Sequence, residues 1–189
     1  MIAAQGRVWL GIDPGRSGAM AIVTERIVYP VGESPLIADA WPTPMLDEKT
    51  YDLAAITTWL REWRHRIAGA TVERLSAMPP MFKGKGGVPR AGGSAANFGR
   101  GESRGWFWML AALEIPTVGV VPQAWQRVMH EGAKGADTKA RSIETALRLF
   151  PGVSLLESDR ARKYSDGMAD AILLAEHGRR NRTLFGGHR

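Results

Sequence analysis

Cysteine is absent from the 189-residue chain, and its absence removes whole classes of site. Disulfides and thiolate-bound metals are excluded, so any metal must be held by oxygen or by histidine. The four histidines do not show the HxxxH-type spacing of a metal-binding helix. We expect each of them, including His177, to be an ordinary side chain with His177 exposed. Carboxylate oxygens are therefore the ligands to look for.

Long apolar runs are also missing. No segment approaches the roughly 20 apolar residues that span a bilayer. The first residues, Met-Ile-Ala-Ala-Gln-Gly-Arg, lack the charged start and apolar centre of a signal peptide. We therefore expect a cytoplasmic protein that has no membrane partner.

Positive charge is what the chain has in excess. It carries 25 Lys and Arg against 19 Asp and Glu, and this predicts a polyanionic partner, with nucleic acid as the leading candidate. The length is near that of one domain, and a hydrophobic fraction of 44% is enough for a sizeable core. We expect one domain over residues 1–178, followed by a basic, disordered tail over residues 179–189.

The hydrophobic pattern predicts an α/β fold with a sheet of mixed direction. Two strands joined by a turn at residues 14–18 form a hairpin, and later strands alternate with helices. The expected strands are 8–12, 19–24, a short third strand at 26–30 that completes a meander, 70–75 and 117–121. The expected helices are 52–68, 105–113, one that begins at Pro122, 137–150 and 166–179, and residues 79–105 are expected to be a basic, glycine-rich loop.

Four acidic residues stand in ordered settings within this pattern. Asp13 follows an apolar strand and directly precedes a Pro-Gly turn. This placement is typical of a metal ligand at a strand end but also of an ordinary turn. Glu73 lies in the apolar segment 70–75. Asp166 and Asp170 are four residues apart on an expected helix, so both lie on one face. The alternative is that Asp166 is an N-cap and Asp170 a solvated position.

A divalent cation offers an explanation for these like charges. Oxygen ligands suit Mg²⁺, with Mn²⁺ as the other choice, and two ions roughly 3.5–4 Å apart stabilise the attacking and leaving oxygens of a phosphodiester. We predict that Asp13, Glu73, Asp166 and Asp170 are catalytic residues that hold two such ions.

The basic residues suit phosphate contacts that demand no base sequence. Phe82 or Met81 is a candidate wedge between unstacked bases, although a loop Phe also packs commonly against its own protein. For Lys134 and Lys139, a solvated helix face is an equally good explanation. We expect the tryptophan clusters at 59–63 and 106–109 to pack in the core or at a subunit contact. The predicted DNA contacts are Phe82, Lys83, Lys85, Arg90, Arg100, Arg104, Lys134 and Lys139.

In their order, these segments resemble the RuvC-like Holliday junction resolvases of the RNase H-like superfamily, in particular the phage-type branch. The resemblance covers nearly the whole chain. The segments that carry it are Leu10-Gly11-Ile12-Asp13-Pro14-Gly15, Glu73 with Ala77-Met78-Pro79, Phe98-Gly99-Arg100-Gly101, Ile115-Pro116, Val121-Pro122-Gln123-Ala124-Trp125 and Asp166-Gly167-Met168-Ala169-Asp170-Ala171. One departure stands out: cellular members commonly space the last acidic pair by three residues, whereas here the spacing is four and Gly167 takes the three-residue position.

The resemblance implies an RNase H-like fold, a mixed five-stranded sheet flanked by helices. It also implies a magnesium-dependent endonuclease for DNA recombination and repair, with no organic cofactor. A homodimer would cut the two opposed strands of a four-way junction symmetrically and leave 5′-phosphate ends.

Three other functions stay open. A different RNase H-like nuclease would use the same carboxylates on branched DNA or on an RNA–DNA hybrid. An actin-like phosphotransferase also begins with a strand, Gly-Ile-Asp and a glycine turn, but the chain is short for two such domains. A catalytically silent junction-binding protein would have no need to keep Asp13, Glu73 and Asp170 together.

Overall fold

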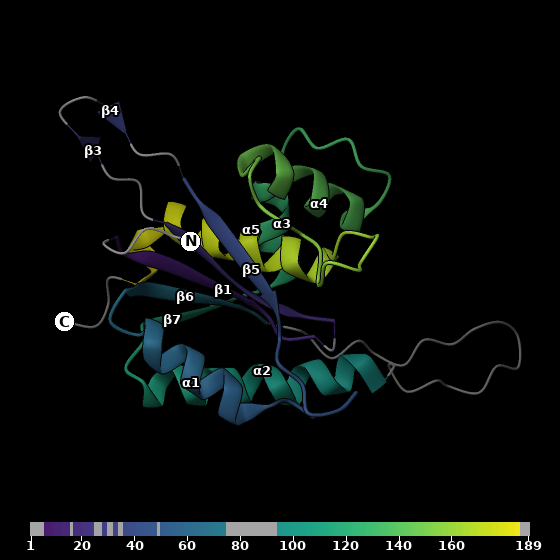
Figure 1. Cartoon of the computed structure of the whole chain (residues 1–189). Helices are drawn as coiled ribbons and strands as arrows, with labels where there is room; N and C mark the ends of the chain where they lie inside the picture. The colour runs from purple at the N-terminus through teal and green to yellow at the C-terminus, as the bar shows by residue number, and fades with distance from the viewer. Residues whose placement is uncertain are drawn as a thin grey trace, which may run out of the picture.

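The computed structural model describes residues 6–15, 17–24, 28–29, 32–33, 36–48, 50–74 and 94–185. Its centre is a five-stranded sheet of order β5-β2-β1-β6-β7 (Figure 1). Strand β1 pairs antiparallel with β2 and parallel with β6, so the sheet is mixed, as predicted. The strands are β1 (Val8–Asp13), β2 (Ala19–Thr24), β5 (Ala38–Pro42), β6 (Ile67–Glu73) and β7 (Thr117–Val120).

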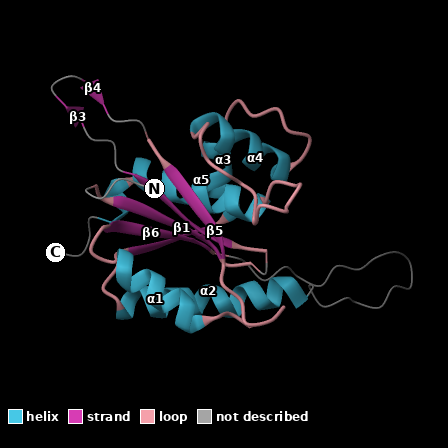
Figure 2. Ribbon diagram, in the orientation of Figure 1, coloured by secondary structure: helices cyan, strands magenta, loops and turns pink. Residues whose placement is uncertain are grey.

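Helices cover both faces of this sheet (Figure 2). Helices α1 (Leu53–Trp63) and α2 (Ser94–Ala112) lie on one face. Helix α5 (Asp166–Arg180) crosses the other face, and α3 (Pro122–Met129) and α4 (Thr138–Leu149) pack against it. No helix within the described ranges is long and apolar enough to cross a membrane.

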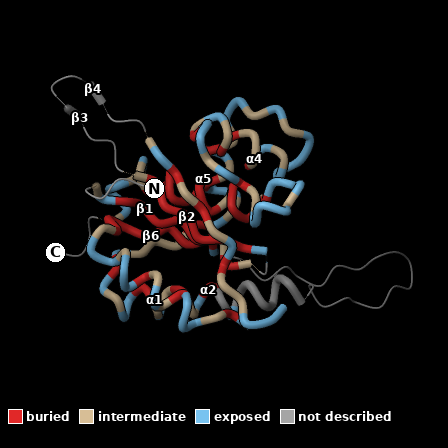
Figure 3. Tube along the Cα trace, in the orientation of Figure 1, coloured by how far each residue is buried: buried red, intermediate tan, exposed pale blue. Residues whose placement is uncertain are grey.

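The side-chain alternation of β1 divides the core into two layers. Val8, Leu10 and Ile12 are fully buried and pack with the α1 and α2 side of the core. Gly11 has the opposite orientation, and a methyl group there would overlap the main-chain carbonyl oxygen of Ala171 on α5. The absence of a side chain at Gly11 therefore lets α5 lie directly on the sheet, the most deeply buried part of the fold (Figure 3).

The expected meander is wrong in its third strand. Antiparallel to β2 lies β5, in a stretch where no strand was expected. Pro42 ends β5 at the sheet edge, where the missing amide proton of proline breaks no ladder. Residues 28–29 instead pair with 32–33 in a separate two-stranded sheet, β3 and β4.

Two helix boundaries also differ from the predictions. Helix α1 ends at Trp63, and β6 begins at Ile67, because Arg66 closes a turn onto the Trp63 carbonyl with a bond of 2.8 Å. The apolar Ile67 continued the helical spacing by coincidence. Helix α2 begins at Ser94, so residues 94–104, expected to lie in the loop, are helical. Glycines within this segment concealed the helix from a propensity argument.

The tail also differs from the expectation of disorder, as far as it is described. Helix α5 continues to Arg180, and a short 3-10 helix, η1, spans Arg182–Phe185. The ring of Phe185 meets that of Trp9 edge-on at 5.1 Å between centroids. Residues 186–189 lie outside the described residues, and the domain limit at residue 178 stays a prediction.

Candidate active site

Two neighbouring parallel strands bring the first pair of carboxylates to the same end of the sheet, where both strands finish. Ile12 of β1 is in register with Val72 of β6, and Asp13 and Glu73 each follow by one residue. Ile12 and Val72 both point into the core beside α1 and α2. Alternation along a strand therefore directs Asp13 and Glu73 to the opposite face, where α5 lies.

The first turn of α5 supplies the second pair. The N-cap is Ser165, whose hydroxyl accepts a hydrogen bond from the amide of Met168 at 3.4 Å. Asp166 is thus the first residue of the helix and not its cap, so the capping alternative is wrong. Asp170 lies one turn further along the same face.

The other three carboxylates act electrostatically on Asp13, which indicates that they lie near it. Burial raises the pKa of Asp13 well above its usual range, and Glu73, Asp170 and Asp166 raise it further. Burial raises the pKa of Asp170 to about 7, although a hydrogen bond from Ser142 acts in the opposite direction. Burial also raises the pKa of Glu73. A divalent cation at this end would offset both the desolvation and the repulsion.

The donor set fits Mg²⁺ or Mn²⁺ in its chemistry, because all of its ligands are hard oxygens. A further observation supports the fit: Oδ1 of Asp170 is buried and has no hydrogen-bond partner. The side chains do not converge on one point, since no group of three acidic or histidine side chains in the described ranges lies close enough to hold an ion. Asp166 is instead turned towards Lys139, with 2.7 Å between Oδ2 and Nζ.

Residues that sequence patterns did not identify hold these carboxylates in place. The indole nitrogen of Trp125 on α3 donates a hydrogen bond of 3.0 Å to Oε1 of Glu73. Ser103 on α2 donates to the main-chain carbonyl of Glu73 at 3.2 Å. A buried tryptophan needs a partner for its N–H, and this was the available signal for Trp125. Serines such as Ser103 and Ser142 give no comparable signal.

Gly167 explains the four-residue spacing of the last acidic pair. A methyl group at this position would overlap the main-chain carbonyl oxygen of Ser17, in the turn between β1 and β2. No carboxylate side chain can therefore occupy the three-residue position while α5 stays where it is. Asp166, one residue earlier, is partly exposed and pairs with Lys139.

The predicted DNA contacts fall into three groups. Phe82, Lys83, Lys85 and Arg90 lie outside the described residues, as does Met81, and Arg100 lies on α2 without a described side chain. Arg104 is exposed on α2, directly after the residue that bonds to Glu73. Lys134 and Lys139 are exposed near the start of α4. Among these predicted DNA contacts with described side chains, Lys139 is the one that pairs with a carboxylate of the site.

The tryptophans and His177 agree only in part with the burial expected from the sequence. Trp106 is fully buried in the core and Trp59 stacks on Trp63, whereas Trp108 is 73% exposed. His177 is buried on α5, so the expectation that it is exposed is wrong.

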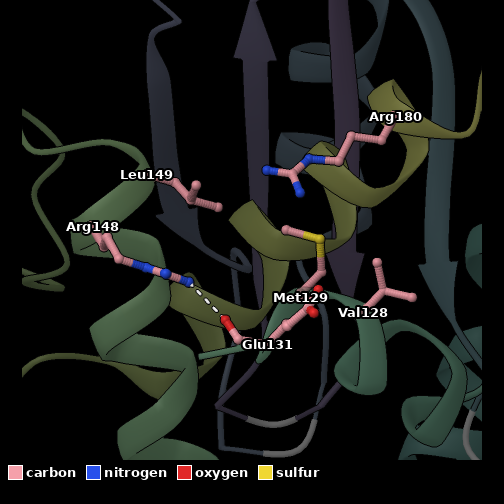
Figure 4. Close-up of a pocket in the computed structure, with 6 residues that line it drawn as sticks. All are labelled: Val128, Met129, Glu131, Arg148, Leu149 and Arg180. Atoms are coloured by element: carbon pink, nitrogen blue, oxygen red, sulfur yellow. Dashed lines mark hydrogen bonds between the residues drawn. The ribbon is translucent and has the colours of Figure 1, made fainter. Parts of the chain in front are cut away.

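Two pockets flank the helices beside the site. One, of about 640 Å³, opens between α3 and α4 and is lined in part by Gln126, Arg127, His130 and Arg141. The other, of about 360 Å³, includes Arg180, the last residue of α5, and so lies at the far end of this helix from Asp166 (Figure 4). There Arg148 donates to the main-chain carbonyl of Glu131 at 3.2 Å.

The raised pKa of Asp170 predicts how the stability of the metal-free protein depends on pH. A carboxyl whose pKa is higher when folded binds its proton more tightly in the folded state. Its contribution to stability is therefore complete below about pH 4 and is lost as the pH rises to about 7. We expect Asp170→Asn to melt increasingly above wild type over that interval, measured by circular dichroism in EDTA. A difference in melting temperature that does not change with pH would contradict the assignment.

Comparisons with known proteins identify the type of fold. No protein-family model matches the chain, and no curated protein matches it. Among solved structures, the chain is similar to RuvC of T. thermophilus in complex with a Holliday junction substrate, with a TM-score of 0.52 and 14% identity over 93% of this chain and 96% of that one. A second T. thermophilus RuvC structure has a TM-score of 0.49 and 17% identity, over 94% and 97% of the two chains. The mixed five-stranded sheet flanked by helices is thus an RNase H-like fold, as predicted.

Proposed function

We propose that this protein is a metal-dependent, structure-selective DNA endonuclease that resolves four-way junctions. The observation that carries the proposal is the placement of Asp13 and Glu73 at the same end of two paired strands, near Asp166 and Asp170 at the start of α5, with Asp13, Glu73 and Asp170 desolvated. Buried carboxylates that repel one another reduce stability, so their presence favours a functional role. A similar fold that is seen in complex with a Holliday junction supports junction DNA as the substrate.

The four carboxylates would hold two Mg²⁺ ions, or two Mn²⁺ ions. When bound, such ions activate a water molecule and stabilise the charge on the scissile phosphate. Trp125 fixes the orientation of Glu73. Lys139 neutralises Asp166 and places a positive charge at the rim, where a phosphate would approach. Arg104 is exposed on α2, one residue after Ser103, and would neutralise phosphate charge of bound DNA.

The remaining parts of the proposal concern assembly and setting. A homodimer would match the twofold symmetry of a four-way junction and would introduce paired nicks in opposed strands. The protein would act in the cytoplasm in DNA recombination and repair, as a phage-type member of the RuvC-like resolvases, and in the host cell if it is encoded by a bacteriophage. The alternative from another class, a silent junction-binding protein, does not account for the desolvated carboxylates of Asp13, Glu73 and Asp170.

Cleavage of a synthetic mobile four-way junction in Mg²⁺ tests this function. We expect paired, symmetric nicks in opposed strands of the junction, and no cutting of a linear duplex of the same sequence. A replication fork and an RNA–DNA hybrid, tested in parallel with products mapped on every strand, separate the resolvase from other RNase H-like nucleases. Cutting of the hybrid or the fork in preference to the junction would overturn the proposed substrate but keep the metal site.

A further inference from the structure

Two helices on opposite faces of the sheet restrain Glu73, and they hold different parts of it (Figure 2). From α2, the buried hydroxyl of Ser103 donates to the main-chain carbonyl of Glu73 at 3.2 Å. From α3, Nε1 of the completely buried Trp125 donates to the side-chain oxygen Oε1 of Glu73 at 3.0 Å. The main chain and the carboxylate are therefore both fixed, and the bond from Trp125 is the one that engages a potential metal ligand.

Pairing with β7 adds a third restraint on Glu73. This residue is in register with Val120, and the amide of Arg74 donates to the main-chain carbonyl of Val120 at 2.7 Å. The ladder therefore continues past Glu73, although β6 ends there. Because the backbone is held, the carboxylate can move only by rotation about its own side-chain bonds, and the bond from Trp125 opposes this rotation.

The ring of Trp125 is itself held in place. Its plane meets that of the His130 imidazole at 78°, with 5.5 Å between the ring centroids. Nε2 of His130 lies 2.9 Å from the hydroxyl oxygen of Ser142 on α4. The indole N–H is thus directed at Glu73 from a rigid support.

The bond from Trp125 makes the two carboxylate oxygens of Glu73 unequal. Oε1 accepts the indole proton, so Oε2 is the oxygen that is available to an ion. A carboxylate that offers one oxygen is a monodentate ligand, and one that offers both is bidentate. Turning both oxygens of Glu73 towards one ion would pull Oε1 away from the indole.

This restriction has different consequences for different hard cations. Mg²⁺ requires octahedral coordination with ligands at about 2.0–2.1 Å. Ca²⁺ takes six to eight oxygens at about 2.3–2.6 Å in a flexible geometry, and bidentate carboxylates commonly supply two of them. A rigid, monodentate glutamate therefore suits the smaller ion and withholds an oxygen from Ca²⁺.

We propose that Trp125 is a specificity-determining residue for the metal, which fixes Glu73 as a monodentate ligand and so favours Mg²⁺ or Mn²⁺ over Ca²⁺. This role rests on the metal site of the proposed function. It adds a selectivity that the carboxylates alone do not provide, because hard oxygens bind all of these ions. Without the indole N–H, Mn²⁺ should bind about 10–100-fold more weakly, the usual effect of losing a group that orients a metal ligand. Ca²⁺ should be affected less, because a released Glu73 can offer both oxygens.

The test is metal binding by the full chain without DNA. Electron paramagnetic resonance of free Mn²⁺ gives the Kd for Mn²⁺, and displacement of bound Mn²⁺ by Ca²⁺ gives the Kd for Ca²⁺. In wild type, we expect the Kd for Ca²⁺ to be the larger of the two. In Trp125→Phe, the ratio of the Kd for Ca²⁺ to that for Mn²⁺ should fall by about 10-fold.

Trp106→Phe is the matched control. Trp106 is also completely buried, and its Nε1 has no hydrogen-bond partner in the described ranges. The substitution makes the same change in the core without removing a hydrogen bond, so both Kd values should stay within a few-fold of wild type. Circular dichroism establishes that both variants are folded.

A second variant at position 125 keeps the packing and removes only the donor. Replacement of Trp125 by 3-benzothienylalanine retains the shape of the indole, with a sulfur in place of the N–H. The ratio of the two Kd values should fall as it does in Trp125→Phe, and this variant decides the question if Trp125→Phe is not folded. In junction cleavage at a fixed Mg²⁺ concentration, both variants should have a lower kcat with an unchanged Kd for the junction.

The outcomes distinguish a failure of this role from a failure of the proposed function. If the ratio in both Trp125 variants equals that in Trp106→Phe, the indole does not select the metal. Equal losses of Mn²⁺ and Ca²⁺ binding would also overturn the role, because they would indicate general damage to the site. In both cases the metal site itself would stand, since wild type binds Mn²⁺. If wild type fails to bind Mn²⁺, the metal site of the proposed function is wrong, and so is the role of Trp125.

Discussion

Asp13→Asn is expected to reduce the rate of junction cleavage by about 10³-fold, because the variant loses stabilisation of charge in the transition state. Asn keeps the shape of Asp but loses the negative charge that a divalent ion requires. Junction binding should stay within a few-fold of wild type, because DNA affinity depends mainly on Lys and Arg contacts with phosphates. Single-turnover cleavage and an electrophoretic binding assay in Ca²⁺ measure the two quantities separately.

The same substitution should stabilise the metal-free protein. Asp13 is desolvated and is repelled by Glu73, Asp170 and Asp166, and a neutral amide relieves both effects. We therefore expect a higher melting temperature in EDTA at pH 8, with roughly 2–4 °C for each kcal/mol gained in a domain of this size. A residue that served only the fold would show the opposite change.

Asp39→Asn is a matched control for this prediction. Asp39 is a half-buried carboxylate on β5, and its pKa is also raised by burial. It makes a local hydrogen bond with the amide of Ala40 at 3.0 Å, and it is not one of the four carboxylates of the site. Cleavage by this variant should equal that of wild type. Retained cleavage by Asp13→Asn in Mg²⁺ would refute the assignment of the site.

Gly11→Ala is expected to lower the free energy of unfolding by about 3 kcal/mol, at the upper end of overpacking effects. The added methyl group would overlap the carbonyl oxygen of Ala171, and its second neighbour is the amide nitrogen of Ala175. Both belong to the main chain of α5, so no side chain can rotate away to make room. Helix α5 must shift, and it carries Asp166 and Asp170 with it. Urea denaturation measures the loss.

The same substitution at Gly101 should have the opposite sign. Gly101 is exposed on α2, and nothing lies within 4 Å of the position of a methyl group there. Alanine is favoured over glycine inside a helix by roughly 0.5–1 kcal/mol, so Gly101→Ala should stabilise the protein by about that amount. If both variants were destabilised equally, the contact between β1 and α5 would not be the cause.

Patterns of period two and period 3.6 were sufficient to predict the central hairpin, the parallel strand that carries Glu73, and α5. They failed where a local signal gave the wrong answer. No strand was predicted over β5, which ends in a proline, although an edge strand tolerates proline. Glycines within α2 suggested a loop, although tertiary packing overrides a weak helix propensity.

The sequence likewise indicated some residues of the candidate site and missed others. The places of the site's four acidic residues on strand ends and on the first turns of a helix could be predicted, while their role as metal ligands stays a prediction. The groups that orient them could not be predicted. Trp125 reaches Glu73 from α3, an element whose packing on α5 no local sequence pattern reveals. Its role depends on the three-dimensional arrangement of helices.

The contact of Gly167 with the turn at Ser17 also limits how the sequence can change over evolution. Moving the acidic residue from position 166 to position 167 requires one substitution to remove the old carboxylate and another to add the new one. The second would displace the start of α5 unless the turn had first been rebuilt to make room. Whichever substitution comes first, the intermediate protein has an impaired site or a displaced helix. The spacing of the pair is therefore an inherited trait that single mutations cannot readily revise.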